Sequence, residues 1–193
     1  ASCAASRPTP LRTAATRIFV VARNGRSVEG LAVAITGGAR GIGLATAERL
    51  ASAGARVAIG DLDGDAVLQT AAALGPQHLG LQADVRDADA LRTAFDGADV
   101  VVHLAFLITG NASRETTRSI NVDGTLNAFR AAAAAGARRF VHASSVAAYG
   151  WHPDNPELIP EDWPVRPAAR LFYGQEKAEL EQLLDAEAAT THD

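Results

Sequence analysis

The chain has 193 residues, of which 48% are hydrophobic and 21% are charged, a length that suits one globular domain with a substantial core. No stretch approaches the roughly 18 consecutive apolar residues of a membrane-spanning helix, so we expect a soluble protein with no membrane partner. A formal net charge of -4 argues against nucleic acid as the main partner, because phosphate backbones are bound by clustered Lys and Arg, and favours a small molecule.

The N-terminal segment differs in composition from the rest of the chain. The first 30 residues carry five arginines against one acidic residue, but Pro8 and Pro10 interrupt the amphipathic helix that a transit peptide would form. Cys3 is the single cysteine, which excludes an internal disulfide and a cysteine-based zinc site and fits a reducing cytoplasm. We therefore interpret residues 1–27 as a disordered or artefactual extension and residues 28–193 as the folded domain.

From residue 31 onward, apolar runs of strand length alternate with Ala- and Leu-rich stretches of helix length. Fully apolar runs such as Val100–Val102 fit a sheet that is covered on both faces. Alternating strands and helices indicate right-handed βαβ units, so we predict an α/β fold with a doubly wound parallel sheet and helices on both faces. The predicted strands are Leu31–Thr36, Arg56–Gly60, His78–Leu81, Val100–Leu104 and Arg139–His142. The predicted helices are Ile42–Ala53, Asp65–Leu74, Ala88–Phe95, Ser113–Ala135 and Leu171–Glu187.

A glycine-rich turn, Gly37-Gly38-Ala39-Arg40-Gly41-Ile42-Gly43, joins the first predicted strand to the first predicted helix. A helix that begins directly after a strand exposes unpaired N–H groups and the positive end of its dipole, which together bind anions. Glycine at positions 37, 41 and 43 would permit positive φ angles, the close approach of a diphosphate, and tight packing of the helix on the strand. A tight loop that binds nothing is the alternative interpretation of such a turn without this context.

An acidic residue at the end of the second predicted strand is a second indication of dinucleotide binding. Asp61 stands about 20 residues beyond the turn, where a carboxylate accepts hydrogen bonds from the adenosine ribose 2′-OH and repels a 2′-phosphate. Arg40 favours the opposite preference, because a guanidinium pairs with phosphate. We expect Asp61 to decide, so the predicted cofactor is NAD rather than NADP. Asp63 and Asp65 are interpreted as a turn residue and a cap of the next helix.

The Gly-x-x-x-Gly-x-Gly spacing of Thr36–Gly43 resembles that of the short-chain dehydrogenase/reductase superfamily. Three later segments, Asp99–Ala105, Asn121–Asn127 and Phe140–Gly150, resemble the extended branch of that superfamily, which contains NAD-dependent epimerases and dehydratases and relatives that act on hydroxysteroids. The resemblance covers about residues 28–187. It implies a Rossmann-like fold, NAD as the cofactor and a small-molecule substrate.

By this resemblance the catalytic residues are Ser145, Tyr173, Lys177 and Asn121. A Tyr and a Lys four residues apart on a helix lie on one face, where Tyr173 would exchange a proton with the substrate while Lys177 favours its phenolate and holds the nicotinamide ribose. Ser145 would hydrogen-bond the substrate oxygen, with Ser144 as the substitute candidate. Asn121 would fix a helix kink or hold a water in a proton relay, with helix capping as its alternative. Taken alone, the Tyr–Lys pair would mark an exposed helix face and the serines would be caps, but the order of the motifs along the chain favours catalysis.

The resemblance also implies which residues contact the cofactor. They are Gly37, Gly38, Arg40, Gly41, Ile42, Gly43, Asp61, Asp84, Val85, Leu104, Ala105, Tyr173 and Lys177. Asp84 and Val85 would line the adenine pocket, unless Asp84 caps the next helix. His103 is expected to be buried at a strand end near the cofactor, and no metal site is predicted. Trp151 and Trp163 flank a proline-rich segment that would form an ordered loop over the site.

Members of the extended branch continue beyond the Tyr–Lys helix into a C-terminal substrate-binding part, which this sequence lacks. The sequence also contains no methionine, so we expect a truncated or processed version of a longer product. The resemblance implies an NAD-dependent oxidoreductase of the epimerase/dehydratase type, which transfers a hydride between nicotinamide and a secondary alcohol or ketone such as a nucleotide sugar or a hydroxysteroid-like substrate. A non-catalytic NAD(P)-binding regulator and an inactive fragment are the alternatives. The helices Ser113–Ala135 and Leu171–Glu187 would form the interface of a homodimer.

Overall fold

The computed structural model describes residues 12–13, 27–108 and 112–190 of the chain. Its strands form one sheet in which neighbouring strands are parallel, in the order β1-β6-β5-β2-β3-β4. The chain winds outward from the middle of the sheet in both directions, and ligands of such folds bind at the carboxyl ends of the strands where the winding reverses, here between β2 and β5. The strands are β1 (Arg12–Thr13), β2 (Ala32–Thr36), β3 (Arg56–Asp61), β4 (Leu79–Gln82), β5 (Val100–His103) and β6 (Arg139–His142).

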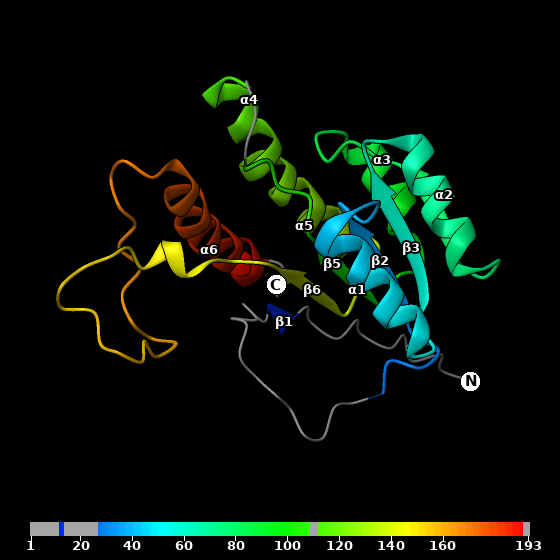
Figure 1. The fold of residues 1–193 in the computed structure, drawn as a ribbon, viewed down its shortest axis with the longest axis horizontal. Helices are drawn as coiled ribbons and strands as arrows, with labels where there is room; N and C mark the ends of the chain where they lie inside the picture. The colour runs from blue at the N-terminus through cyan, green and yellow to red at the C-terminus, as the bar shows by residue number, and fades with distance from the viewer. Residues whose placement is uncertain (1–11, 14–26, 109–111, 191–193) are drawn as a thin grey trace, which may run out of the picture.

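Helices cover both faces of the sheet (Figure 1). On one face, α1 and α2 pack on β2 and β3, where Ala47 and Val67 meet Ile35 and Ile59. On the other face, α3, α5 and α6 pack on β5 and β6. The fold class predicted from the alternation of strands and helices is therefore confirmed. The helices are α1 (Gly41–Ser52), α2 (Gly64–Leu74), α3 (Ala88–Ala94), α4 (Arg114–Arg118), the π-helix η1 (Ser119–Asp123), α5 (Gly124–Ala134), the 3-10 helix η2 (Val146–Ala148) and α6 (Phe172–Thr190).

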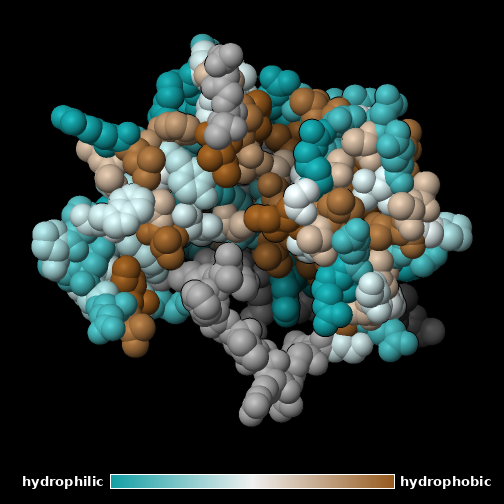
Figure 2. Space-filling model, viewed as in Figure 1, coloured by the Kyte–Doolittle hydropathy of each residue, from teal (hydrophilic) through white to brown (hydrophobic). Residues whose placement is uncertain are grey.

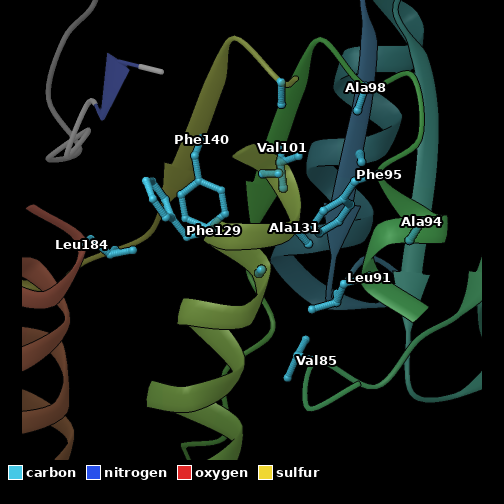
Figure 3. Close-up of a cluster of buried hydrophobic side chains, with 14 of the residues drawn as sticks. Val85, Leu91, Ala94, Phe95, Ala98, Val101, Phe129, Ala131, Phe140 and Leu184 are labelled. Atoms are coloured by element: carbon cyan, nitrogen blue, oxygen red, sulfur yellow. The ribbon is translucent and has the colours of Figure 1, made fainter. Parts of the chain in front are cut away.

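The core beneath α3, α5 and α6 is built around aromatic and branched side chains (Figure 3). Phe129 of α5 meets Phe140 of β6 edge to face, with 5.4 Å between the ring centroids, a favoured arrangement for aromatic pairs. Leu91 of α3 and Leu184 of α6 are buried in the same cluster. This core fixes α6, which carries the predicted Tyr–Lys pair, against β6.

Each predicted strand and helix is present with bounds that differ by three residues or fewer, except that the helix predicted over Ser113–Ala135 is interrupted. Its middle turn, η1, is π-helical, a local widening that occurs often at functional sites. The Thr125 hydroxyl donates to the Asn121 carbonyl at 2.5 Å in this turn. Gly124 follows, and a Cβ there would lie 2.5 Å from a Val85 side-chain carbon, so the helix lies very close to the loop after β4.

The acidic caps differ from those predicted. Asp63, not Asp65, is the N-cap of α2, because its carboxylate accepts from the Ala66 N–H at 3.1 Å. Asp65 lies in the first turn instead, where a negative charge favours the helix dipole. Likewise Asp87, not Asp84, caps α3. The assignment of the cap to Asp65 and the capping alternative for Asp84 are therefore wrong, because composition alone does not specify which carboxylate of an acidic run turns back to the helix.

Two segments differ from the picture predicted from the sequence. Most of the predicted extension 1–27 is outside the described residues, but two of its residues form β1, paired with β6. The proline-rich segment between η2 and α6, yellow to orange in Figure 1, loops outward beyond α6 and does not fold back over the glycine turn. Arg166 holds it together by bonding to Asp154 and Asn155.

The two long helices expected at a dimer interface are joined within one chain. Arg118 makes two short hydrogen bonds to the Glu179 carboxylate of α6, and Arg130 pairs with Glu187. The homodimer stays a prediction.

The surface seen in Figure 2 is mixed, with apolar patches lying among hydrophilic residues. Across the part of the chain that is described, no helix combines the length and the apolar character needed to cross a bilayer. The same residues hold no group of three or more His, Cys, Asp or Glu side chains arranged for a metal ion.

Candidate functional site

The glycine turn lies at the carboxyl end of β2, beside the loop that follows β5. Gly37 has a φ of +68°, and a Cβ there would lie 2.8 Å from the Ala105 nitrogen, so only glycine lets these two backbone segments approach. A Cβ on Gly43 would lie 2.0 Å from the Gly37 carbonyl oxygen, which explains how α1 packs directly on the turn. The three predicted elements, strand, turn and helix, are therefore brought together as expected.

The outer side of this turn is open and has the chemistry of an anion site. Gly41 has a φ of +55°, and a Cβ there would meet no atom within 4 Å. Arg40 is the N-cap of α1, but its side chain makes no capping bond, so the first N–H groups of the helix keep their capacity to donate. A diphosphate fits such a cradle, because both the exposed N–H groups and the helix dipole favour negative charge. Ile42 lies beside it as an exposed apolar side chain.

Asp61 lies at the end of β3 and faces the glycine turn. Its carboxylate accepts from the Ala39 N–H at 3.1 Å and from the Asp63 N–H at 3.2 Å. Asp61, the residue predicted to bind the ribose, is thus held next to the predicted diphosphate cradle. Arg40 points to the same corner, and its guanidinium pairs with the Asp63 carboxylate at 2.7 Å.

The predicted adenine-pocket residues have other partners in this structure. Asp84 pairs with Arg86 at 2.5 Å, and this guanidinium lowers the pKa of the Asp84 carboxyl. Val85 is buried against Gly124 and so fixes the start of α5. Both residues lie in the loop after β4.

A chain of hydrogen bonds links the ends of β2 and β5 to η1. His103, 1% exposed, lies between Thr36 at 2.7 Å and Thr125 at 3.0 Å. Because the Thr125 hydroxyl already donates to Asn121, His103 Nε2 must donate to Thr125 and Nδ1 must accept from Thr36. Burial, with a smaller contribution from the charge of Lys177, lowers the pKa of His103 to about 3, so this single tautomer is neutral. His103 is a buried strand-end residue, as expected.

Tyr173 and Lys177 lie on one face of α6, next to the loop after β5. The Lys177 ammonium donates to the Ala143 carbonyl at 2.7 Å and lies 5.9 Å from the centre of the Tyr173 ring. Phe106 contacts both residues: its ring is 3.5 Å from the Lys177 nitrogen and meets Tyr173 edge to face at 5.7 Å. Burial lowers the pKa of Lys177 to about 8, although the nearby Glu176 acts in the opposite direction.

The predicted serines point to different partners. Ser145 is half-buried, and its hydroxyl accepts from the Ala147 N–H at 3.1 Å, which leaves the hydroxyl hydrogen able to donate to a substrate oxygen. Ser144 instead donates to the Glu181 carboxylate of α6. A Cβ on Gly174 would lie 2.6 Å from the Ala147 carbonyl oxygen, so glycine lets α6 approach the Ser145 turn closely.

Asn121 is buried in η1 and joins three segments. Its side chain accepts from the Leu107 N–H at 2.7 Å and donates to the Leu107 carbonyl at 2.9 Å. The same amide nitrogen donates to Glu176 of α6 at 2.8 Å. The capping alternative for Asn121 is therefore wrong, because its side chain binds a loop and a second helix. It lies within the distorted turn, where the kink was expected.

Two residues at this site were not predicted from the sequence. Phe106 lies in the loop after β5, and only its contacts with α6 reveal its position. Glu176, 2% exposed, was overlooked although Tyr173, Glu176, Lys177 and Leu180 share the spacing of one buried helix face. That spacing indicates that Glu176 is buried, but it does not identify Asn121 as its partner.

Comparisons with known proteins agree with this geometry. A sequence model described as the NAD dependent epimerase/dehydratase family matches residues 33–192. The chain is 38% identical over 116 residues to an L-arabinose 1-dehydrogenase (NAD(P)(+)) from Haloferax volcanii, covering 58% of this chain and 40% of that protein. It is 36% identical over 115 residues to 3 beta-hydroxysteroid dehydrogenase type 7 of Rattus norvegicus, covering 57% of this chain and 34% of that protein.

Two solved structures of a dehydrogenase and an epimerase are also similar to this chain. The uronate dehydrogenase of Agrobacterium tumefaciens is similar with a TM-score of 0.64 and 32% identity, over 79% of this chain and 54% of that one. A UDP-glucose-4-epimerase from Stenotrophomonas maltophila, with bound NAD, is similar with a TM-score of 0.67 and 29% identity, over 83% of this chain and 49% of that one. The chain thus spans about half of the length of these structures and less than half of the two curated relatives.

Proposed function

The chain belongs to the NAD-dependent epimerase/dehydratase family, and from this premise we propose that it binds NAD at the carboxyl ends of β2, β3 and β5 and takes part in hydride transfer. The observation that carries the proposal is the position of Tyr173 and Lys177. Both contact Phe106, in the loop whose Ala105 touches Gly37 of the glycine turn. The proton-transfer residues and the nucleotide cradle thus belong to one continuous site.

The chain offers a separate partner for each part of the cofactor. The N–H groups at the start of α1 would hold the diphosphate, and Asp61 would accept from the adenosine ribose hydroxyl. Lys177 would hold the nicotinamide ribose with the ammonium that now donates to Ala143. Bound NAD supplies the hydride acceptor, or in its reduced form the donor.

The side chains around Tyr173 supply the proton chemistry. Ser145 would donate to the substrate oxygen and direct it toward Tyr173, whose hydroxyl oxygen takes the proton of an alcohol or returns it to a ketone. The buried ammonium of Lys177 favours the phenolate of Tyr173 by charge. Asn121 would hold the loop after β5 in place through Leu107.

The substrate is proposed to be a secondary alcohol or ketone of the sugar or steroid type. The names of the relatives support this, because they are dehydrogenases of arabinose, sorbitol, a uronate and a hydroxysteroid, together with a UDP-glucose epimerase. The buried Tyr–Lys face favours catalysis over a purely regulatory role. Since the chain spans about half of these proteins, turnover is to be measured on the full gene product as well as on the chain itself.

The test compares the wild type with Tyr173→Phe in two assays. Calorimetry is expected to give the same dissociation constant for NAD in both proteins, because the phenol is not needed for binding. Formation of NADH with arabinose, a uronate or a hydroxysteroid, or conversion of UDP-glucose to its epimer, should fall by a factor of about 10² to 10⁴. Tyr149→Phe changes the other tyrosine and should leave turnover intact. A wild type that does not bind NAD, or a Tyr173→Phe variant with full turnover, would overturn the proposal.

A further inference from the structure

An ion pair lies across the corner where the adenosine ribose is expected. A guanidinium nitrogen of Arg40, in the glycine turn, is 2.7 Å from a carboxylate oxygen of Asp63, in the turn after β3. The two side chains are 68% and 46% exposed, so the pair contributes little to folding and can exchange partners at low cost. Arg40 is the cationic residue of the glycine turn, and Asp63 is its counter-ion.

Asp63 is fixed by other bonds, whereas Arg40 is not. The second carboxylate oxygen of Asp63 caps α2 by accepting from the Ala66 N–H, and the backbone N–H of Asp63 donates to Asp61. Asp61 in turn binds the turn at Ala39. The negative charge of Asp63 is therefore held in place, and the flexible arginine comes to it.

We propose that Asp63 determines nucleotide selectivity by holding the Arg40 guanidinium away from the position of a 2′-phosphate. The inference rests on the proposed function, because it requires a dinucleotide at this turn. An arginine in the turn would by itself favour NADP, since the guanidinium fork matches phosphate oxygens. With Asp63 as its partner, Arg40 is neutralised, and the Asp61 carboxylate is left to select a free ribose hydroxyl.

The variant Asp63→Asn separates this role from the capping role. Asparagine is as good an N-cap as aspartate, so α2 should keep its start, while the charge that holds Arg40 is removed. The released guanidinium can then pair with the 2′-phosphate of NADP. NAD has no phosphate at this position, so its binding should hardly change.

Calorimetry with NAD and NADP on the wild type, Asp63→Asn, Arg40→Ala and the double variant tests the inference. We expect Asp63→Asn to bind NADP about fivefold more tightly than the wild type, the size of one exposed ion pair. In the Arg40→Ala background the same change should bring less than a twofold gain, since no guanidinium is left to release. Raising the salt concentration should reduce the fivefold gain, because the charges are exposed.

Asp65→Asn is the matched control. It removes the same charge two residues further along, from an exposed side chain with no bond to Arg40 among the described residues. An equal NADP gain in Asp65→Asn, or a gain that persists without Arg40, would show a general charge effect and overturn the inference. A wild type that binds NAD, with no NADP gain in Asp63→Asn, would overturn the inference alone. A wild type that binds neither nucleotide would overturn the proposed function, and the inference with it.

Discussion

The side-chain nitrogen of Lys177 lies 3.5 Å from the centre of the Phe106 ring. The ring belongs to the loop after β5 and covers the ammonium group of Lys177, a residue that is only 4% exposed. Two effects oppose each other there, since an aromatic face attracts a cation while the loss of water penalises it. Burial is the main cause that lowers the pKa of Lys177 to about 8.

Lys177 should therefore titrate well below the usual range of lysine. It is the only lysine in the sequence, so isotopically labelled lysine gives a single side-chain NMR signal, expected to titrate near pH 8. Between about pH 8 and the ordinary value of 10.5, the unfolded chain holds one more proton than the folded chain, so stability should rise with pH. The rise should reach about 3 kcal/mol at most and be absent in Lys177→Met. A signal that titrates above pH 10 would contradict this.

Removing the Phe106 ring should move the pKa of Lys177 back toward the ordinary value of lysine. In Phe106→Ala water reaches the ammonium, and the pKa of Lys177 should rise. The lost cation–π attraction, about 2 kcal/mol at most, is smaller than the roughly 3 kcal/mol that the lowered pKa represents. The same NMR titration checks the direction of the change. Phe172→Ala, on the same helix and in contact with Arg114 instead, is the control in which the Lys177 signal should stay in place.

Asn121 should contribute strongly to stability although it lies in a helix. Asn121→Ala leaves the Leu107 backbone groups and the Glu176 carboxylate without this partner, at an expected cost of about 2 to 4 kcal/mol in urea unfolding. Asn127→Ala, two turns later, loses only bonds of 3.3 and 3.5 Å to the loop after β4 and should cost less than about 1 kcal/mol. Equal losses of stability in the two variants would argue against a special structural role of the Asn121 hydrogen bonds.

Gly41 should matter for the nucleotide more than for the fold. Gly41→Ala places a methyl group in the open space of the turn at positive φ, with an expected loss of about 1 kcal/mol in stability. NAD binding should weaken about tenfold or more, because the methyl group occupies the approach of the diphosphate. Gly97→Ala has a comparable φ and equally open surroundings, but lies before β5, at the other end of the sheet. It should lose the same stability and bind NAD normally in calorimetry.

The sequence predicts the fold well because its signals are local. The strands of the central sheet are mostly apolar, and the helices between them end at clear breakers such as Gly136, so type and order follow from pattern alone. A kink at Asn121 was expected from the family resemblance, but the apolar pattern did not reveal the interruption at η1, because a π-helical turn keeps the apolar spacing of the helix on either side. The acidic caps were assigned to the wrong residues, since Asp63 and Asp65 have equal capping propensity.

Part of the candidate site could likewise be predicted from the sequence, and part of it could not. The glycine turn and Asp61 are separated by few elements, and their spacing predicts their meeting. Glu176 binds Asn121 across 55 positions of sequence, and no periodic pattern encodes such a pair. Phe106 was missed for a similar reason: an aromatic residue after a strand is ordinary until the opposite helix is in place.

The hydrogen bonds that join Asn121 to the loop after β5 and to α6 have a mechanical consequence. One amide group is bonded both to the loop that bears Phe106 and to the helix that bears Tyr173. Neither segment can move far without stretching a buried bond, so a displacement caused by a ligand on one of them is transmitted to the other. Loop and helix should therefore shift together as one rigid unit when the site closes.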